Sequence, residues 1–320
     1  MKKFISVLLA AAACVMLFAG CGETKEEGTL QVAVVQQLDH SSLQEIRVAV
    51  EARLSEIAKE KNLTIRYEEF NGQNDPTILG QIGSQIAGGS FDAVIPIGTL
   101  AAQCMVTATD GMEIPINYAA ISDPAAAGLT GIPNVTGTSD ALDTGLILDM
   151  MQSADSGIKT VGLLYSNSEP NSETPIAQAK ELLDARGIAY VEKTGNTADE
   201  ILTAASALVG RVDAVFTPTD NAVMNVAPAV SEVFNKNGIA YYTGADSFVS
   251  AGAFATCGVN YTELGYKTAD MAVDFMVNGS CPEFQKMDGG IIAYNSDTAA
   301  ALGLDVSVFA SMASEVKDVK

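Results

Sequence analysis

Two stretches of this 320-residue chain end an apolar run in side chains that form hydrogen bonds. VDAVFTPTDN (212–221) ends in Thr219, Asp220 and Asn221, and a similar run, FDAVIPIGTL, leads to Thr99. Carboxylate, amide and hydroxyl groups in such positions can bind the polar groups of a small ligand. The same residue types are also the usual helix caps, so capping is the alternative explanation for any one of them.

The charges near these strand ends indicate which ligand would suit them. Asp123, Asp220 and Asp246 could pair with a cationic group, and hydroxyls with backbone N–H groups could bind one carboxylate. The five arginines lie outside these loops, and Lys193 is the only basic residue near them. A phosphate, sulfate or dicarboxylate would normally recruit an arginine. This balance predicts a zwitterionic amino acid.

Motifs for catalysis are missing from the sequence. His40 is the only histidine, and the chain has no phosphate loop, no GxSxG and no cluster with metal-ligand spacing. Cys104, Cys257 and Cys281 show no CxxC spacing, and a Cys257–Cys281 disulfide stays open. We therefore expect a protein that is not an enzyme and has no metal and no cofactor. A net charge of −21 also makes nucleic acid a poor partner.

Strand-like apolar runs alternate with helical segments along the chain. The strands are predicted at 30–36, 64–70, 91–97, 114–121, 159–166, 188–194, 212–218, 239–245, 253–261 and 289–295. The helices are predicted near 43–61, 76–88, 100–110, 172–186, 198–209, 221–237 and 262–278. Asp-Ala-Val occurs in the third strand of each half, which indicates two similar βα units. Such alternation requires parallel sheets covered on both faces.

The expected fold is α/β, with two doubly wound parallel-sheet lobes joined by a hinge that the chain crosses several times. The expected boundaries are 30–138 plus 259–280 for the N-terminal lobe, 139–258 plus 285–310 for the C-terminal lobe, and 311–320 for a tail. Parallel sheets bind ligands at the carboxyl ends of their strands. If the lobes face each other, the polar strand ends of both halves line one cleft.

The N-terminus is predicted to target and anchor the protein. Residues 1–20 have the basic start and short apolar stretch of a signal peptide, and LFAGC ends in Cys21, the predicted lipidation site. Residues 21–29 would form a lipidated tether. The predicted location is the extracytoplasmic side of the cell membrane.

Several motifs resemble one known family, the ABC transporter substrate-binding lipoproteins of the tryptophan/tyrosine type. The motifs are VVQQLDHSSL (34–43), ISDPAAAGL (121–129), NVTGTSD (134–140), LLYSNSEPNS (163–172), VDAVFTPTDN (212–221), GADS (244–247) and GVNYTELGY (258–266). The resemblance implies a type I periplasmic-binding-protein fold with three hinge crossings and an aromatic amino acid as ligand. By position it implies a cleft lined by Thr99, Ser122, Asp123, Asn167, Asn171, Ser172, Asp220 and Asp246. Strand-end position adds Gln37 and Thr219.

The predicted function is that of a monomeric solute-binding lipoprotein of an ABC importer. It would close about its hinge on tryptophan or tyrosine and deliver this ligand to an ABC permease. One alternative is a ligand-sensing receptor for a membrane signalling partner. Another is a binder of a sugar or nucleoside, although sugar sites commonly use Trp and the chain has none.

Overall fold

The computed structural model describes residues 28–320. The predicted signal peptide, the lipidation site Cys21 and most of the predicted tether lie outside these residues. Within the described chain, no helix has the length and apolar character needed to cross a membrane.

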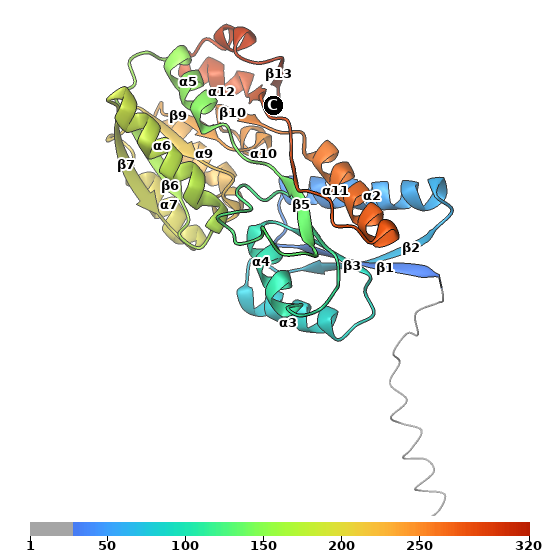
Figure 1. The fold of residues 1–320 in the computed structure, drawn as a ribbon. Helices are drawn as coiled ribbons and strands as arrows, with labels where there is room; N and C mark the ends of the chain where they lie inside the picture. The colour runs from blue at the N-terminus through green and yellow to red at the C-terminus, as the bar shows by residue number, and fades with distance from the viewer. Residues whose placement is uncertain (1–27) are drawn as a thin grey trace, which may run out of the picture.

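The N-terminal lobe is built on a parallel sheet with strand order β11-β5-β4-β3-β1-β2. Its strands are β1 (Thr29–Gln36), β2 (Thr64–Asn71), β3 (Ala93–Ile97), β4 (Ile116–Tyr118), β5 (Val135–Ser139) and β11 (Gln285–Lys286). Its helices are α2 (Ser41–Glu60), α3 (Pro76–Ala87), α4 (Thr99–Ala108) and α11 (Tyr261–Asn278). Figure 1 shows α2 and α11 on one side of this sheet and α3 and α4 on the other.

The C-terminal lobe has a sheet with strand order β13-β12-β10-β9-β8-β6-β7. Its strands are β6 (Thr160–Tyr165), β7 (Ala189–Thr194), β8 (Ala214–Thr217), β9 (Ala240–Thr243), β10 (Ala255–Gly258), β12 (Ile291–Tyr294) and β13 (Glu315–Asp318). Its helices are α5 (Thr144–Ala154), η2 (Pro170–Ser172), α6 (Glu173–Arg186), α7 (Ala198–Ser206), α8 (Asn221–Met224), α9 (Ala227–Lys236), α10 (Asp246–Ser250), α12 (Ser296–Leu302) and η3 (Ser307–Ser311). All neighbouring strands of this sheet are parallel except β10 and β12.

The two lobes confirm the predicted α/β class with two parallel-sheet lobes. The central strands β3 and β8 are buried along their whole length, as their apolar runs predict. Capping residues that can be recognised in the sequence mark the starts of two helices. Asp75 caps α3 directly before Pro76, and Thr197 forms a capping box with Glu200 at the start of α7.

The chain passes between the lobes three times, at 140–143, 259–260 and 287–290. Two segments lie elsewhere than the predicted boundaries put them. β11, at Gln285–Lys286, pairs with β5 of the N-terminal lobe, so the third crossing comes after residue 286. Residues 311–320, predicted as a tail, contain β13, which extends the C-terminal sheet by pairing with β12.

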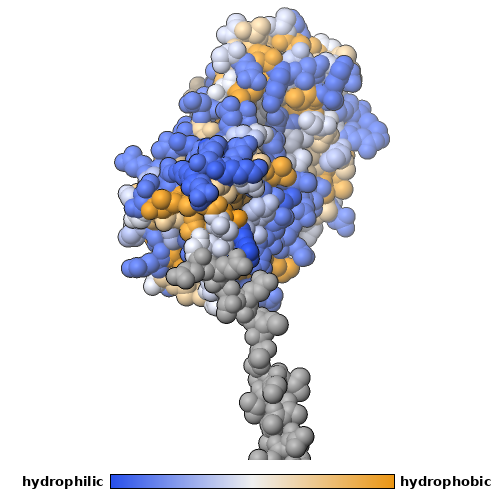
Figure 2. Space-filling view, turned by 90° about the vertical axis from the view of Figure 1, so that its right-hand side faces the viewer, coloured by the Kyte–Doolittle hydropathy of each residue, from blue (hydrophilic) through white to orange (hydrophobic). Residues whose placement is uncertain are grey.

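Gly265 allows α11 and α2 to pack closely. A Cβ at this position would lie 2.6 Å from Ala49 Cβ and 2.7 Å from the Ile46 carbonyl oxygen. The contact joins α11, which follows the second crossing, to the first helix of the chain. The face of the molecule in Figure 2 is largely hydrophilic, with hydrophobic residues in scattered patches.

Candidate ligand-binding site

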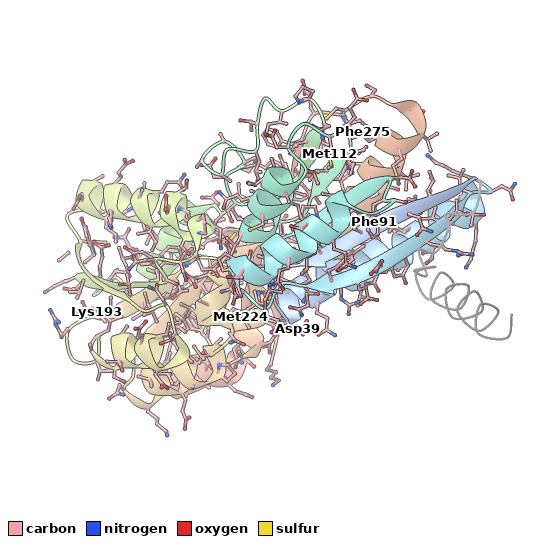
Figure 3. The ribbon with its side chains drawn as sticks, turned by 90° about the horizontal axis from the view of Figure 1, so that it is seen from below. Asp39, Phe91, Met112, Lys193, Met224 and Phe275 are labelled. Atoms are coloured by element: carbon pink, nitrogen blue, oxygen red, sulfur yellow. The ribbon has the colours of Figure 1, made fainter. Side chains whose placement is uncertain are left out.

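A pocket lies between the two lobes, at the carboxyl ends of their strands. The N-terminal lobe contributes His40, Ser42, Leu43, Gly98, Thr99, Ala120 and Ser122. The C-terminal lobe contributes Asn171, Thr219, Asp220, Asn221, Met224, Ala245 and Phe248, and the hinge contributes Asp140 and Tyr261. Figure 3 shows Asp39, next to His40, close to Met224 where the lobes meet.

The structure brings five of the ten predicted site residues into this pocket. They are Thr99, Ser122, Asn171, Thr219 and Asp220. Thr99 and Asp220 lie on opposite walls, as two facing lobes require. Two more, Gln37 and Ser172, are buried directly behind the wall, where they bond to Leu100 and Asp220.

Asp220 is a buried carboxylate with three protein donors. Its Oδ2 accepts hydrogen bonds from the Ser166 backbone N–H and the Ser172 hydroxyl, both at 2.7 Å, and its Oδ1 accepts one from the Val223 N–H at 2.9 Å. The last bond caps α8, so the capping explanation holds as well. Burial raises the pKa of Asp220 to about 6. An ionised Asp220 would be stabilised by a cation on the ligand, because none of the described residues that line the pocket is a lysine or arginine.

The C-terminal wall offers a second acceptor. Asn171 donates from Nδ2 to the Thr219 carbonyl oxygen at 2.5 Å, which leaves its Oδ1 buried and without a partner among the described residues. Together with Asp220, this wall presents acceptors and negative charge to the pocket. A ligand group with several N–H donors fits it.

The N-terminal wall has the opposite character. Two helices begin there, α2 after His40 and α4 at Thr99. Neither has a hydrogen bond from its N-cap side chain, and in the first turn of α4 the Leu100 N–H donates to Gln37 Oε1. The Thr99 hydroxyl is buried and has no partner among the described residues. The first N–H groups of a helix carry partial positive charge and bind anions. This wall therefore suits a carboxylate.

One part of the pocket is apolar. Its side chains are Leu43, Ala120, Met224, Ala245 and Phe248. Phe248 is buried and packs edge-on against Tyr241, with ring centroids 6.4 Å apart. Such a wall can hold a hydrophobic side chain of the ligand.

Direct contacts hold the two lobes together around the pocket. The Ser122 and Thr219 hydroxyls lie 3.1 Å apart, and the Thr174 hydroxyl donates to Asp123 at 2.8 Å. The Ser42 hydroxyl bonds to that of Ser247 across the same gap. The lobes are therefore closed on each other in this structure.

Glu169 belongs to the same interlobe contact and is 1% exposed. It accepts hydrogen bonds from Asn74 Nδ2 at 3.1 Å and Gln37 Nε2 at 3.3 Å, both in the N-terminal lobe, and lies 2.7 Å from Asn221 Nδ2. Burial, with a smaller contribution from the Asp220 charge, raises the pKa of Glu169 to about 8. Gln37 thus contributes to closure instead of lining the pocket.

Three predicted site residues lie outside the pocket. Asp123 turns back on its own loop, where its Oδ1 accepts from the Ala125 and Ala126 N–H groups. Asn167 is exposed and bonds to Thr194 and Asn196. Asp246 pairs with Lys317 of β13 at 2.9 Å. In each case a local turn or a strand distant in sequence directs the side chain elsewhere.

Lys193 is also removed from the site. Figure 3 places it at the outer end of the C-terminal lobe, well away from Met224 and Asp39. It does lie beside the strand-end loop that follows β6, because β7, which carries it, pairs with β6, but β7 is the edge strand of the sheet and Lys193 does not line the pocket.

Four functional candidates are absent from the predicted site: His40, Asp140, Glu169 and Tyr261. Asp140 lies at the first hinge crossing, and Tyr261 directly follows the second. Tyr261 Oη is 3.4 Å from Asp140 Oδ2, and the Ser122 hydroxyl donates to Asp140 Oδ1 at 3.1 Å. Burial raises the pKa of Asp140 to about 6. All four residues stand in the family-like motifs, and His40 also follows the first predicted strand, but neither signal gives the direction of a side chain.

The pairing of the cysteines, which the sequence leaves open, is visible within residues 28–320. Cys104, Cys257 and Cys281 are free thiols, so Cys257 and Cys281 do not pair. Among the same residues no group of three or more His, Cys, Asp or Glu side chains is placed to hold a metal ion.

Comparison with known proteins agrees with this geometry. The family model described as ABC transporter substrate binding protein matches residues 31–314. A tyrosine-binding protein of Clostridioides difficile is 29% identical over 322 residues, covering 95% of this chain and 93% of that protein.

Two solved structures differ in their similarity to this one. An ABC domain from Streptococcus pneumonia in complex with L-Trp has a TM-score of 0.83 at 26% identity, covering 90% of this chain and 100% of that one. A ligand-free, open substrate-binding protein with adhesive properties from Clostridium difficile has a TM-score of 0.67 at 31% identity, covering 91% of this chain and 100% of that one. The structural similarity is therefore higher to the Trp complex, although the sequence identity is lower.

Proposed function

This chain belongs to the ABC transporter substrate-binding protein family, and we propose that it binds an aromatic α-amino acid between its lobes for import through an ABC permease. Members of this family are extracytoplasmic solute-binding proteins and not enzymes, and they hand a small molecule to a permease. Our proposal concerns three further properties: the identity of the ligand, the closure of the lobes around it, and a lipid anchor on Cys21.

The opposite character of the two pocket walls is the observation that carries the proposal. The C-terminal wall offers Asp220 and Asn171 Oδ1 to a cation, and the N-terminal wall offers Thr99 and two helix N-termini to an anion. An α-amino acid carries an ammonium group and a carboxylate group attached to the same carbon. It would connect the two walls and so favour the closed arrangement over the open one.

The apolar part of the pocket supports an aromatic side chain. Leu43, Met224 and Phe248 offer it packing surface. The name of the tyrosine-binding relative and the L-Trp complex point the same way. Tyrosine and tryptophan are the two ligands that we propose.

Ligand identity can be tested by a thermal-shift screen of the twenty amino acids, sugars and nucleosides. A ligand present at 100 times its dissociation constant should stabilise the protein by about 2.7 kcal/mol. We expect L-tyrosine or L-tryptophan to give the largest shift. Tyramine, which lacks the carboxylate, and 3-(4-hydroxyphenyl)propanoate, which lacks the amine, should give little. Stabilisation by a sugar or nucleoside alone would refute the amino-acid proposal.

Closure and anchoring need separate measurements. If ligand closes the lobes, the radius of gyration from small-angle scattering should fall when L-tyrosine is added, and an unchanged radius would contradict a hinge mechanism. If Cys21 carries a lipid, Cys21→Ser should release the protein from the membrane fraction into the medium. Uptake of labelled tyrosine by cells with and without the protein tests the import role.

A further inference from the structure

Asp140 is a buried carboxylate of the pocket and is separate from Asp220, which would hold the ammonium of the ligand. It lies at the first hinge crossing and is 5% exposed. Its Oδ1 accepts a hydrogen bond from the Ser122 hydroxyl at 3.1 Å, and its Oδ2 lies 3.4 Å from Tyr261 Oη. Hydroxyl groups at both oxygens are the contacts of an ionised carboxylate. Burial raises the pKa of Asp140 to about 6, so the group is ionised at about pH 7.5.

The ionised Asp140 fixes the direction of a hydrogen bond between the lobes. An ionised carboxylate can only accept, so the single hydroxyl proton of Ser122 points to Asp140. Thr219 Oγ1, in the C-terminal lobe, lies 3.1 Å from Ser122 Oγ. Because Ser122 has no second proton to donate, Thr219 must be the donor of this bond. The Thr219 oxygen then offers lone pairs, and no proton, to the pocket.

The side-chain conformation of Thr219 is held by Gly244. A Cβ at Gly244 would lie 2.9 Å from the methyl carbon Cγ2 of Thr219, so the methyl group packs over this glycine. The hydroxyl is thereby directed at Ser122 in the other lobe. Threonine is stiff about χ1, so the position of its hydroxyl oxygen is well defined.

Three acceptors of the C-terminal wall lie together. They are Thr219 Oγ1, the carboxylate of the next residue, Asp220, and Asn171 Oδ1. Asn171 Nδ2 donates to the Thr219 carbonyl oxygen, which holds the Asn171 amide beside Thr219 and leaves its Oδ1 buried without a partner among the described residues. The ammonium group of an unsubstituted amino acid has three N–H donors, so each of them would find one acceptor.

We propose that the pocket selects a primary amine through Thr219, whose hydroxyl oxygen accepts one ammonium N–H, and that Asp140 is a positioning residue that keeps the Ser122 proton away from Thr219. The ligand part rests on the proposed function. Ser122 and Thr219 belong to different lobes, so the arrangement exists only in the closed form. The selection of the amine therefore coincides with closure.

The role of Asp140 follows from what its removal would permit. The Ser122 proton would then have Thr219 Oγ1, 3.1 Å away, as its acceptor. The Thr219 proton would turn toward the pocket and face an ammonium N–H, donor against donor. One N–H of the buried ligand would lose its hydrogen bond.

N-methyl-L-tyrosine is the probe for the third acceptor. It keeps the charge, the carboxylate and the ring of L-tyrosine and has two ammonium N–H donors instead of three. Calorimetric titration at about pH 7.5 gives the selectivity, defined as the dissociation constant of N-methyl-L-tyrosine divided by that of L-tyrosine. We expect a selectivity of at least about tenfold for the wild type. A wild type that binds both ligands equally well would overturn the proposal.

Thr219→Val removes the acceptor and hardly changes the side-chain volume. Its selectivity should fall to within about twofold of unity, whereas Thr219→Ser, which keeps the hydroxyl, should retain most of it. An unchanged selectivity in Thr219→Val would exclude the contact between Thr219 and the amine.

Asp140→Ala tests the positioning role, and a second substitution makes the test specific. Asp140→Ala should lower the selectivity at least about threefold, because the Ser122 proton can turn to Thr219. Adding Ser122→Ala removes that proton, so the double variant should recover most of the selectivity. An equally low selectivity in both variants would show that Asp140 does not act through Ser122. If Asp140→Ala does not fold, the outcome for Thr219→Val still decides the proposal.

Thr174→Val is the matched control. Thr174 donates to Asp123 at 2.8 Å, which is another hydroxyl contact between the lobes, but neither residue lines the pocket. A weaker closed form should weaken both ligands equally and leave the selectivity unchanged. A fall in selectivity as large as that of Asp140→Ala would show that any loss of interlobe contact produces the effect, and the proposal would fail.

The outcomes separate this inference from the proposed function. If the wild-type protein binds neither L-tyrosine nor L-tryptophan, the proposed function fails, and the amine contact fails with it. If the protein binds L-tyrosine and Thr219→Val leaves the selectivity unchanged, only the inference about Thr219 and Asp140 fails.

Discussion

Replacing Asp220 by Asn is the most direct test of the pocket's charge. The substitution removes the negative charge of the C-terminal wall and hardly changes the side-chain volume. It also affects the three hydrogen bonds to this carboxylate, from Ser166, Ser172 and Val223.

The expected loss of fold stability follows from these bonds. The Ser166 and Val223 donors are backbone N–H groups that bond to different oxygens of Asp220. An amide has one oxygen, so one of the two N–H groups would face an NH₂ group. An unsatisfied buried donor costs about 1–3 kcal/mol, and we expect the free energy of unfolding to fall by that amount.

The expected loss of affinity is larger than this. Removing one member of a buried ion pair costs about 3–5 kcal/mol, because the remaining charge is left uncompensated. The ammonium of a bound amino acid would be in that situation. The dissociation constant of L-tyrosine should therefore rise by about 10²- to 4 × 10³-fold.

Asp246→Asn is the matched control. Asp246, like Asp220, is predicted from its sequence position to line the cleft. In the structure it pairs with Lys317 outside the pocket, and the side chains of Asp246 and Lys317 are 25% and 36% exposed. A pair this exposed contributes at most about 1 kcal/mol, so this variant should be slightly less stable and should bind L-tyrosine normally.

The two variants and the wild type would be compared by calorimetric titration with L-tyrosine and by thermal unfolding. A folded Asp220→Asn protein that binds within about threefold of the wild type would refute the assignment of Asp220 to the ammonium. Equal weakening by Asp246→Asn would show that the acidic charge of the lobe acts as a whole.

Three further predictions concern the opposite wall, the interlobe contact and the packing of the N-terminal lobe. Thr99→Val should weaken L-tyrosine by about tenfold with little change in melting temperature, because it removes one hydrogen bond to a charged group; unchanged affinity in a titration would contradict the carboxylate site. In the closed form the pKa of Glu169 is raised from 4.5 to about 8, so closure takes up a proton. The contribution of this proton uptake to ligand affinity is complete below about pH 4.5 and is lost as the pH rises through about 8. Between pH 6 and pH 9 the wild type should thus lose at least about tenfold more affinity for L-tyrosine than the Glu169→Gln variant does. Calorimetric titrations at the two pH values measure this, and equal pH profiles of the two proteins would exclude the coupling. Gly265→Ala should lower the free energy of unfolding by about 1–3 kcal/mol, because its Cβ would lie 2.6 Å from Ala49 Cβ; denaturant titration measures this, and an unchanged midpoint would show that α11 can shift freely.

The sequence determined the order of elements and the edge of the sheets at which a ligand can bind. Buried strands such as β3 and β8 are recognisable because a strand covered on both faces is apolar throughout. Thr99 and Asp220 were predictable as facing residues, because each follows such a strand directly and the carboxyl ends of parallel strands share one edge. The likeness of the two halves then indicated two lobes with one cleft.

The tertiary structure decided which of the polar residues at that edge enter the pocket. Asp123, Asp220 and Asp246 have the same chemistry and comparable positions, and only Asp220 points inward. The direction of a loop side chain depends on local turns and on partners far along the chain, such as Lys317 for Asp246, which a strand-end pattern does not contain. The contact of Glu169 with Gln37 spans 132 positions and forms only when the lobes meet, so no local signal could have revealed it.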